Sequence, residues 1–388
     1  MGKARSWRSI KQAAAAPESG VSTPGGDRLV SLDVFRGATM AAMVIVNNPG
    51  DWGQVYWPLL HAEWDGWTPT DLIFPFFLFI VGVSITLSRK SASWGSILRR
   101  SALIIAIGLF LAGYPRFDLS RWRIPGVLQR IGLCYLVSAA LYRVVTGDRQ
   151  RRGAILLSVA SGLSLLYWFV MMHVPVPGGI AGDLSPDGNL GAWIDRALMN
   201  GHLWRSLWDP EGLLSTVPAI ATTLFGVVAG IGLGANVAPE RKARELALAG
   251  IGAAIGGLLW GLVFPINKGL WTSSYAVFTS GTACAVLALC YWAIDIKGMR
   301  GWTKPFVILG SNAITLFAAS ALLVKTLAQF KVPGPDGALI TVSRYAYLHY
   351  FLPLAAPRNA SLFYALANLI LLFGLLALMY RRRIFLRV

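Results

Sequence analysis

The sequence predicts an all-α, polytopic membrane protein with about ten transmembrane helices and with both termini in the cytoplasm. The 388 residues are 55% hydrophobic and only 14% charged, with a mean hydropathy of +0.57, whereas soluble domains carry about 25% charged residues. Ten apolar runs have the length of roughly 17–25 residues that a spanning helix needs. Lysine and arginine recur in every second connection, which is typical of loops retained on the cytoplasmic side.

The predicted spans follow one another with few long connections. In chain order they cover residues 30–48, 70–88, 98–114, 124–144, 154–173, 213–235, 244–265, 273–294, 305–328 and 360–380. Residues 1–27 are polar and rich in Ala, Ser, Gly and Pro, without the apolar segment of a signal peptide. We therefore expect a disordered cytoplasmic tail over 1–27 and a single transmembrane domain over 28–388.

Positive charge sets the predicted orientation. Basic residues gather in the tail and at 89–100, 143–152, 241–244, 297–304 and 381–387, which all alternate onto one side. This bias accounts for the net charge of +17, so we do not expect a nucleic-acid partner. The basic loop 116–123 falls on the opposite, outer side and should bind an anion or pair with carboxylates. An eleventh span at 340–356 would move the arginines at 381–383 outside, so an amphipathic or re-entrant segment is preferred there.

Small residues at four-residue spacing predict closely packed helices. Gly226, Gly230 and Gly234 fall on one predicted span, and Gly252 and Gly256 on the next. The three cysteines lie inside apolar runs without metal-ligand spacing, so they should pack between helices, and no metal site is expected. No internal repeat is evident, which weakens an inverted-repeat transporter.

The strongest candidate for chemistry is residues 60–82, where a histidine precedes an apolar span. His61 lies close to the carboxylates of Glu63, Asp65 and Asp71. Histidine exchanges protons near neutral pH, and a nearby carboxylate can orient it and raise its basicity. Asp71 has a second explanation, because a carboxylate at the start of a helix can serve as its N-terminal cap.

Three further groups place polar side chains in or beside the spans. Asp33 and Arg36 lie one turn apart on the first span and can pair, either to fix packing or to mark a ligand path. Asn47 ends the same span. Asn312 lies in a polar patch inside the predicted span 305–328.

The outer side also carries charge at two short motifs. Asp209 and Glu211 in DPEGLLST enter the sixth span, where they can cap the helix or bind a cationic or hydroxylated substrate. Asn267 and Lys268 form an outer turn. A lone lysine there needs an anionic partner, and we expect Asp209 or Glu211.

Taken together, these motifs resemble the transmembrane acetyltransferase family of heparan-α-glucosaminide N-acetyltransferase, including its bacterial NagX-type members. The matching strings are RLVSLDVFRG, VNNPG, HAEWDGWTPTDLIFPFFLFIVG, GVLQRIGLCYLV, DPEGLLST, INKGLWTSSY and LGSNAI. The resemblance implies an acyltransferase domain that uses cytosolic acetyl-CoA to acetylate a glucosamine-type amino sugar on the far side of the membrane. It also implies His61 as the catalytic base or a transient acetyl carrier, with Asp71 and Asn47 as further catalytic residues.

The same resemblance gives expectations for ligands and location. Acetyl-CoA should lie near Asp33, Arg36, Arg89, Lys304 and Asn312, and the sugar near Asp209, Glu211, Asn267 and Lys268. The protein should reside in a bacterial inner membrane, in contact with lipid, where two copies can pair as a homodimer. An amino-sugar transporter and an O-acetyltransferase of envelope glycans remain the alternatives.

Overall fold

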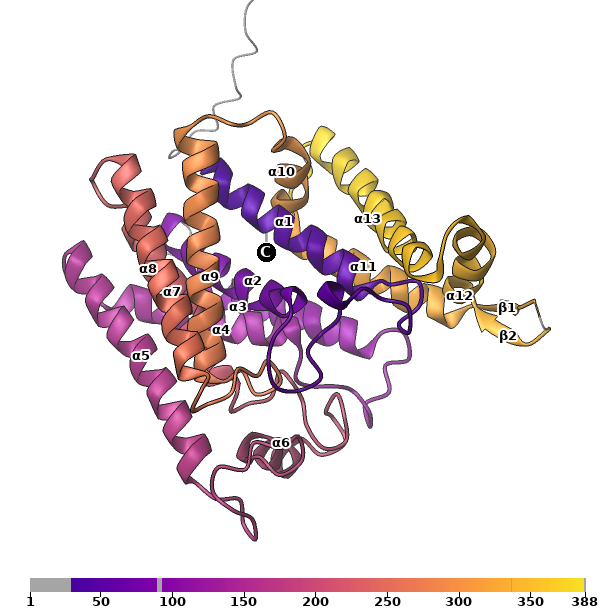
Figure 1. Ribbon diagram of the computed structural model, residues 1–388, viewed down its shortest axis with the longest axis horizontal. Helices are drawn as coiled ribbons and strands as arrows, with labels where there is room; N and C mark the ends of the chain where they lie inside the picture. The colour runs from indigo at the N-terminus through magenta and orange to yellow at the C-terminus, as the bar shows by residue number, and fades with distance from the viewer. Residues whose placement is uncertain (1–28, 89–92, 336, 387–388) are drawn as a thin grey trace, which may run out of the picture.

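The computed structural model describes residues 29–88, 93–335 and 337–386. The described part is built almost entirely from helices, arranged as a bundle with long connections at one end (Figure 1). The long helices are α1 (Val30–Asn47), α2 (Ile73–Leu87), α3 (Trp94–Gly113), α4 (Val127–Val144), α5 (Arg149–His173), α7 (Thr216–Leu233), α8 (Pro239–Trp260), α9 (Ser273–Cys290), α11 (Ala313–Gln329) and α13 (Pro357–Arg381). The expected tail and Arg89 lie outside the described residues.

Shorter elements occupy the connections. The helical ones are η1 (Trp57–Leu59), η2 (Pro69–Leu72), α6 (Leu190–Met199), η4 (Tyr291–Ile296), α10 (Lys304–Ser311), α12 (Val342–Ala346), η5 (Tyr347–Phe351) and η6 (Leu352–Leu354). Strands β1 (Lys331–Pro333) and β2 (Leu339–Thr341) form an antiparallel hairpin in which Lys331 pairs with Thr341. The sequence did not predict α6, which lies within the loop 174–212.

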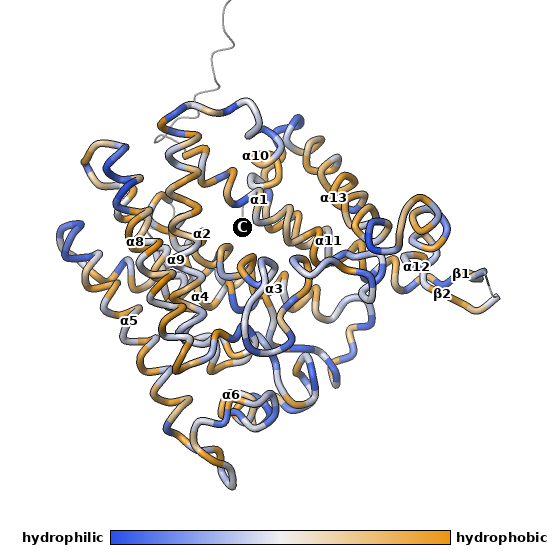
Figure 2. The backbone as a smooth tube through the Cα atoms, in the orientation of Figure 1, coloured by the Kyte–Doolittle hydropathy of each residue, from blue (hydrophilic) through white to orange (hydrophobic). Residues whose placement is uncertain are grey.

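The membrane character is confirmed. Within the described ranges, nine helices are long and apolar enough to cross a bilayer, and the bent pair α10 and α11 makes a tenth if it counts as one span. Figure 2 shows hydrophobic colour along these helices and hydrophilic colour concentrated in the connections. The prediction of about ten transmembrane helices is therefore correct, with η2 extending α2 and η4 extending α9.

The ninth span departs from the prediction of one continuous helix over 305–328. Its two halves, α10 and α11, meet at Asn312 with a bend of 79°. The backbone of Asn312 is not helical, and its side chain accepts a hydrogen bond from the Leu386 N–H at 3.0 Å and donates to the Ile384 carbonyl at 3.2 Å. The break thus anchors the segment that follows α13.

Segment 340–356 forms no eleventh long helix in the described structure. It consists of the end of β2, then α12, η5 and η6, which follow one another without a gap over residues 342–354. The preference for an amphipathic or re-entrant segment over a span is consistent with this length.

Glycines bring helices together, but only some of the expected ones do so. A Cβ on Gly226 would lie 2.1 Å from the carbonyl oxygen of Phe79, so α7 and α2 touch through this backbone. On α8, a Cβ on Gly252 or Gly256 would meet nothing within 4 Å, whereas one on Gly257 would lie 2.3 Å from the backbone of α9. The packing role predicted for Gly252 and Gly256 was wrong, because the face of α8 that meets α9 carries Gly257 instead.

The connections expected on the outer side meet one another at one end of the bundle. Trp64 donates to the Leu184 carbonyl at 3.0 Å, which ties the loop after α1 to the loop after α5. Arg344 pairs with Asp51 at 2.8 Å and brings the α12 region to the same end. The side of the membrane that this end faces stays a prediction.

Candidate active site

The loop before α2 is folded by its own threonines. Thr68 and Asp71 form a capping box at the start of η2, with Pro69 at the first helical position, where proline is favoured. The Thr68 hydroxyl donates to the Leu60 carbonyl at 2.5 Å, and the Thr70 hydroxyl to the Pro58 carbonyl at 2.9 Å. These bonds fold the chain back so that His61, ten residues before Asp71, lies beside it.

His61, Asp71 and Lys268 form a compact group, called the His61 cluster below. Oδ1 of Asp71 lies 2.6 Å from Nδ1 of His61 and 3.3 Å from Nζ of Lys268. Nζ of Lys268 also lies 2.9 Å from Nδ1 and 3.4 Å from Nε2 of His61. Asp71 is buried at 1% exposure, whereas the His61 side chain is 48% exposed. The carboxylate is therefore an internal support, and the imidazole is the group that solvent or a substrate can reach.

Lys268 places a positive charge next to the imidazole. Burial lowers the pKa of its ammonium, while the negative charges of Asp71 and Glu211 oppose that shift. The ion pair of Lys268 is with Asp71, so the expected pairing with Asp209 or Glu211 was wrong. Glu211 acts on this lysine through space rather than through a salt bridge.

The turn after α8 fixes the His61 loop in place. The Asn267 amide donates to Oδ1 of Asp65 at 3.0 Å, and the Gly66 N–H donates to the Ile266 carbonyl at 2.7 Å. Asn267 is 1% exposed and its side-chain oxygen also accepts from the Leu270 N–H. Its side chain is occupied in joining the two loops, so the proposed contact with a sugar has no support in this arrangement.

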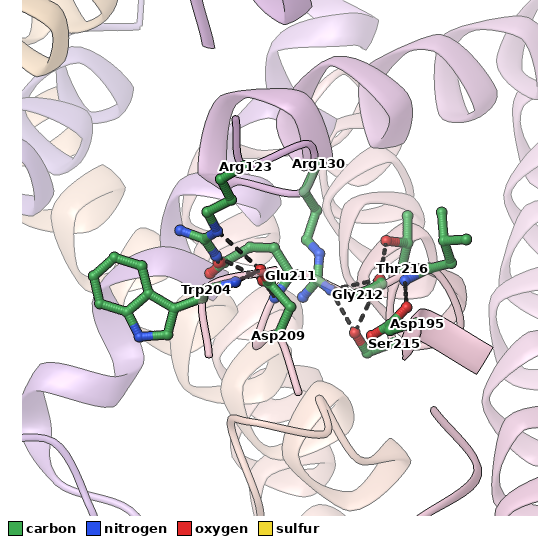
Figure 3. Close-up of polar contacts among 10 residues, drawn as sticks. Arg123, Arg130, Asp195, Trp204, Asp209, Glu211, Gly212, Ser215 and Thr216 are labelled. Carbon is green, nitrogen blue, oxygen red and sulfur yellow. Dashed lines mark hydrogen bonds and ion pairs between the residues drawn. The ribbon is translucent and has the colours of Figure 1, made fainter. Parts of the chain in front are cut away.

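A second polar group lies where the loop after α3 meets the start of α7 (Figure 3). Arg123 binds Asp209 through two nitrogens, at 2.9 and 2.6 Å, and also contacts Glu211. Its guanidinium lies over the ring of Trp204 at 4.9 Å. Burial opposes the charge of Arg123, but the two carboxylates outweigh it and raise its pKa.

This ion pair satisfies the expectation that the basic loop 116–123 binds carboxylates. Asp209 has no exposed side-chain surface and also accepts hydrogen bonds from the backbone of Trp204 and Glu211. A carboxylate engaged on every side supports the loop, and it has little capacity left for a substrate.

Arg130 extends the group into the first turn of α4 (Figure 3). It is 1% exposed, and its Nη2 donates to the Gly212 carbonyl at 3.0 Å and to the Ser215 hydroxyl at 2.5 Å. Its guanidinium faces the ring of Trp271 at 5.2 Å. Sequence reasoning did not select Arg130, although an arginine in the first turn of an apolar span is a usable signal.

Asp195 of α6 lies against the same segment (Figure 3). Its carboxylate accepts from the Leu213 N–H at 2.9 Å, and burial, the main cause, raises its pKa to about 6, aided by the nearby negative charge of Asp209. This residue was also missed, because its position depends on α6, which hydropathy did not predict.

The described residues expected to hold acetyl-CoA lie on α1 and on or just after α10, and these two helices pack against each other. Asp33 and Arg36 pair at 3.2 Å as predicted, and Arg36 also donates to the Ser84 hydroxyl at 2.8 Å. Lys304 begins α10 and is exposed. Asn312 is engaged with the segment after α13. The cofactor role of these residues stays a prediction.

Asn47, the third expected catalytic residue, lies at the exposed C-terminal end of α1. No hydrogen bond joins it to His61 among the residues described. The neighbouring Asn48 is buried and donates to the Val44 carbonyl and to Ser320. The two asparagines thus differ in role, with Asn48 fixing the end of α1 and Asn47 open to solvent.

Chemically, the His61 cluster can move a proton and stabilise charge. Asp71 holds the imidazole through Nδ1, which leaves Nε2 as the nitrogen that faces a reactant. The Lys268 ammonium can neutralise negative charge that develops beside the ring.

Two comparisons with known proteins bear on this site. Residues 28–177, which include His61 and Asp71, match the family model described as heparan-alpha-glucosaminide N-acetyltransferase, catalytic. The chain is also 32% identical over 360 residues to heparan-alpha-glucosaminide N-acetyltransferase of Homo sapiens, covering 75% of this chain and 52% of that protein. The Mus musculus protein of the same name is likewise 32% identical, with 76% and 54% covered. The chain thus spans about half the length of these curated relatives.

Proposed function

We propose that this chain carries the catalytic region of the heparan-alpha-glucosaminide N-acetyltransferase family and is a membrane-embedded N-acetyltransferase. It transfers the acetyl group of cytosolic acetyl-CoA to the amine of a glucosamine-type sugar on the other side of the membrane. The observation that supports this function best is the 2.6 Å contact between His61 Nδ1 and buried Asp71. A histidine oriented by a carboxylate is the arrangement that proton abstraction from an attacking amine requires.

The proposed reaction uses His61 as its base. The amine nitrogen of the sugar attacks the thioester carbonyl carbon and passes its proton to Nε2 of His61. The carbon–sulfur bond then breaks, and CoA leaves as a thiolate that takes this proton from His61. In the alternative route, Nε2 of His61 itself attacks the thioester carbonyl carbon and carries the acetyl group before passing it to the sugar. Lys268 stabilises the negative charge on the carbonyl oxygen in either route.

Asp71 is a positioning residue in this proposal. It accepts hydrogen bonds from the backbone of Ala62 and Thr68 at 3.0 Å each, so its place relative to His61 is fixed by the loop itself. A preorganised support of this kind keeps the imidazole in one orientation while the reactants change.

The acceptor site is proposed to lie on the exposed side of His61. Large aromatic side chains are exposed on the same loop, with Trp57 at 66% and Trp67 at 40%. Indole rings can stack against the apolar face of a pyranose, and they also suit a membrane interface. Asp209 and Asn267 are given up as sugar ligands in this proposal, because their side chains are already engaged.

A test combines purified full-length protein, acetyl-CoA labelled in the acetyl group and a panel of amino sugars including glucosamine. We expect N-acetylated sugar from the wild type, and a loss of about 10²–10⁴-fold in His61→Ala. His173→Ala is the matched control, since His173 ends α5 at an exposed position and stacks on Phe169, away from the cluster.

Two results would contradict the proposal. Wild-type rates in His61→Ala would refute the site, and movement of unmodified amino sugar into proteoliposomes without acetyl-CoA binding would favour a transporter. Label trapped on the wild-type protein in the absence of sugar would favour the acetyl-histidine route over direct transfer.

A further inference from the structure

A cavity of about 360 Å³ lies between the C-terminal ends of α2, α4 and α7 and the start of α5. Its lining includes Thr86 of α2, Tyr142 of α4, Gly234 directly after α7, and Arg149 and Arg152 of α5. The volume is within the range of roughly 300–1,000 Å³ that small-molecule sites occupy. The proposed catalytic group does not involve this place.

The charges on the cavity wall have one sign. Two arginines line it and no acidic residue does. The closest acid along the chain, Asp148, is engaged as the cap of α5 and accepts from the Arg151 N–H at 2.8 Å. The start of α5 adds the partial positive charge of a helix N-terminus.

The Arg152 guanidinium is held in place from one side only. Its Nη2 donates to the Tyr142 carbonyl at 2.5 Å, and the ring of Tyr142 lies 4.2 Å from its central carbon. Its Nε is buried and has no hydrogen-bond partner in the described structure. A buried donor without an acceptor is costly, and it indicates a missing ligand or water.

The Arg149 side chain passes next to Gly234 to reach the cavity. Its guanidinium nitrogen would lie 3.0 Å from a Cβ at Gly234, so the absence of a side chain there makes room for it. Arg149 forms no ion pair with a carboxylate of the described chain. Two arginines around a cavity, with donors left over, match the geometry and charge of a phosphate group.

We propose that this cavity binds a phosphate group through Arg149 and Arg152. It lies at the end of α2 remote from the His61 cluster, on the side that the sequence predicts to be cytoplasmic. The span Pro69–Leu87 has 19 residues, so its two ends are about 27 Å apart at 1.5 Å per residue. A phosphate bound here is thus far from the reacting atoms and serves for anchoring.

Two sources can supply such a phosphate. One is the phosphorylated nucleotide end of the acetyl donor, an assignment that rests on the function proposed above. The other is the head group of an anionic phospholipid, which does not depend on that function.

The test uses the full-length protein with Arg149→Gln and Arg152→Gln, and with Arg151→Gln as the control. Arg151 is exposed on the same turn and does not line the cavity, so its variant loses the same charge. Arg152→Gln also loses its contact with Tyr142 and can destabilise the fold. Arg149→Gln is therefore the variant on which the conclusion depends.

Titration calorimetry in phosphatidylcholine nanodiscs measures binding of CoA and of 3′-dephospho-CoA. Native mass spectrometry counts phosphatidylglycerol retained on the protein.

If the nucleotide is the source, Arg149→Gln weakens CoA binding about tenfold, as expected for one charge-assisted hydrogen bond, and Arg151→Gln leaves it unchanged. A smaller loss with 3′-dephospho-CoA assigns the site to the 3′-phosphate, and an equal loss to the diphosphate. If a lipid is the source, retained phosphatidylglycerol falls in Arg149→Gln while CoA affinity stays constant.

The inference is overturned if neither ligand responds to Arg149→Gln, or if Arg151→Gln has the same effect. Acetyl transfer that depends on His61 but not on Arg149 or on phosphatidylglycerol would leave the proposed function intact while this inference fails. Retention of phosphatidylglycerol that depends on Arg149, in a protein that binds no CoA, would support this inference while the proposed function fails.

Discussion

Asp71 divides its two carboxylate oxygens between His61 and the protein backbone. Oδ1 binds Nδ1 of His61 at 2.6 Å, while Oδ2 accepts from the N–H groups of Ala62 and Thr68. The same side chain therefore caps the helix and orients the histidine. The cap that the sequence suggested for Asp71 is thus present, and its catalytic role stays a prediction.

Asp71→Asn should uncouple these two tasks. An amide has a single acceptor oxygen, so it can serve either the backbone donors or His61 but not both sets. We expect the acetyl-transfer rate to fall about 10²–10⁴-fold, the range attributed to a positioned base. Initial rates with labelled acetyl-CoA measure this, with the thermal midpoint of unfolding as the control for folding. An unchanged rate in a folded variant would show that His61 needs no carboxylate.

Lys268→Met should lower the transfer rate about 10²-fold and alter its pH profile, if the ammonium stabilises negative charge in the transition state. Burial lowers the pKa of Lys268, so in the wild type the ammonium is present at lower pH and is lost as the pH rises through that lowered value. The wild-type rate should therefore decline on the alkaline side, and this decline should be missing in Lys268→Met. Lys331→Met, at an exposed position of β1, should keep the wild-type profile.

Asp209→Asn distinguishes a structural ion pair from a sugar-binding site. Asparagine here removes one of the two carboxylates that Arg123 binds, so the cost should stay below the about 3–5 kcal/mol of leaving a buried charge without any partner. We expect a lower thermal midpoint and an unchanged KM for the sugar. The exposed Asp187 lies just before α6, away from Arg123, and Asp187→Asn should change neither quantity. A raised KM with an unchanged midpoint would restore Asp209 as a substrate ligand.

Asp195→Asn should make the protein more stable at neutral pH. The pKa of this carboxyl rises from 3.8 to about 6 on folding, so the folded state binds more protons between these values and stability falls as the pH rises through them. The penalty above pH 6 is at most about 3 kcal/mol, at 1.36 kcal/mol per pKa unit. Asparagine keeps an acceptor for the Leu213 N–H and removes the charge. The measurement is the thermal midpoint of unfolding from pH 4 to 8. As the pH rises, this midpoint should fall more for the wild type than for Asp195→Asn.

Hydropathy predicted the long helices well, since a membrane span must satisfy its own backbone hydrogen bonds and therefore leaves a long apolar run. It could not predict the bend at Asn312, which depends on contacts with the distant residues Ile384 and Leu386. It also missed α6, whose ten residues are too short for a span.

The site was predicted in part for a similar reason. His61 and Asp71 are ten residues apart on one loop, so their sequence spacing carried the information. The partner of Lys268 was not predictable, because the sequence does not fix which of several acidic loops lies next to the turn after α8. Asp71 took that place and Asp209 paired with Arg123 instead.

The glycines of α7 and α8 allow a matched test of helix packing. Gly226→Ala would place a Cβ 2.1 Å from the Phe79 carbonyl oxygen, so α2 and α7 must separate. We expect a loss of about 1–3 kcal/mol, the usual cost of overpacking. Gly252→Ala meets nothing within 4 Å, and replacing a helical glycine by alanine should stabilise α8 by about 0.5–1 kcal/mol. Thermal midpoints in one detergent should therefore move in opposite directions for the two variants, and equal destabilisation would mean that the exposed face of α8 is covered in the folded protein.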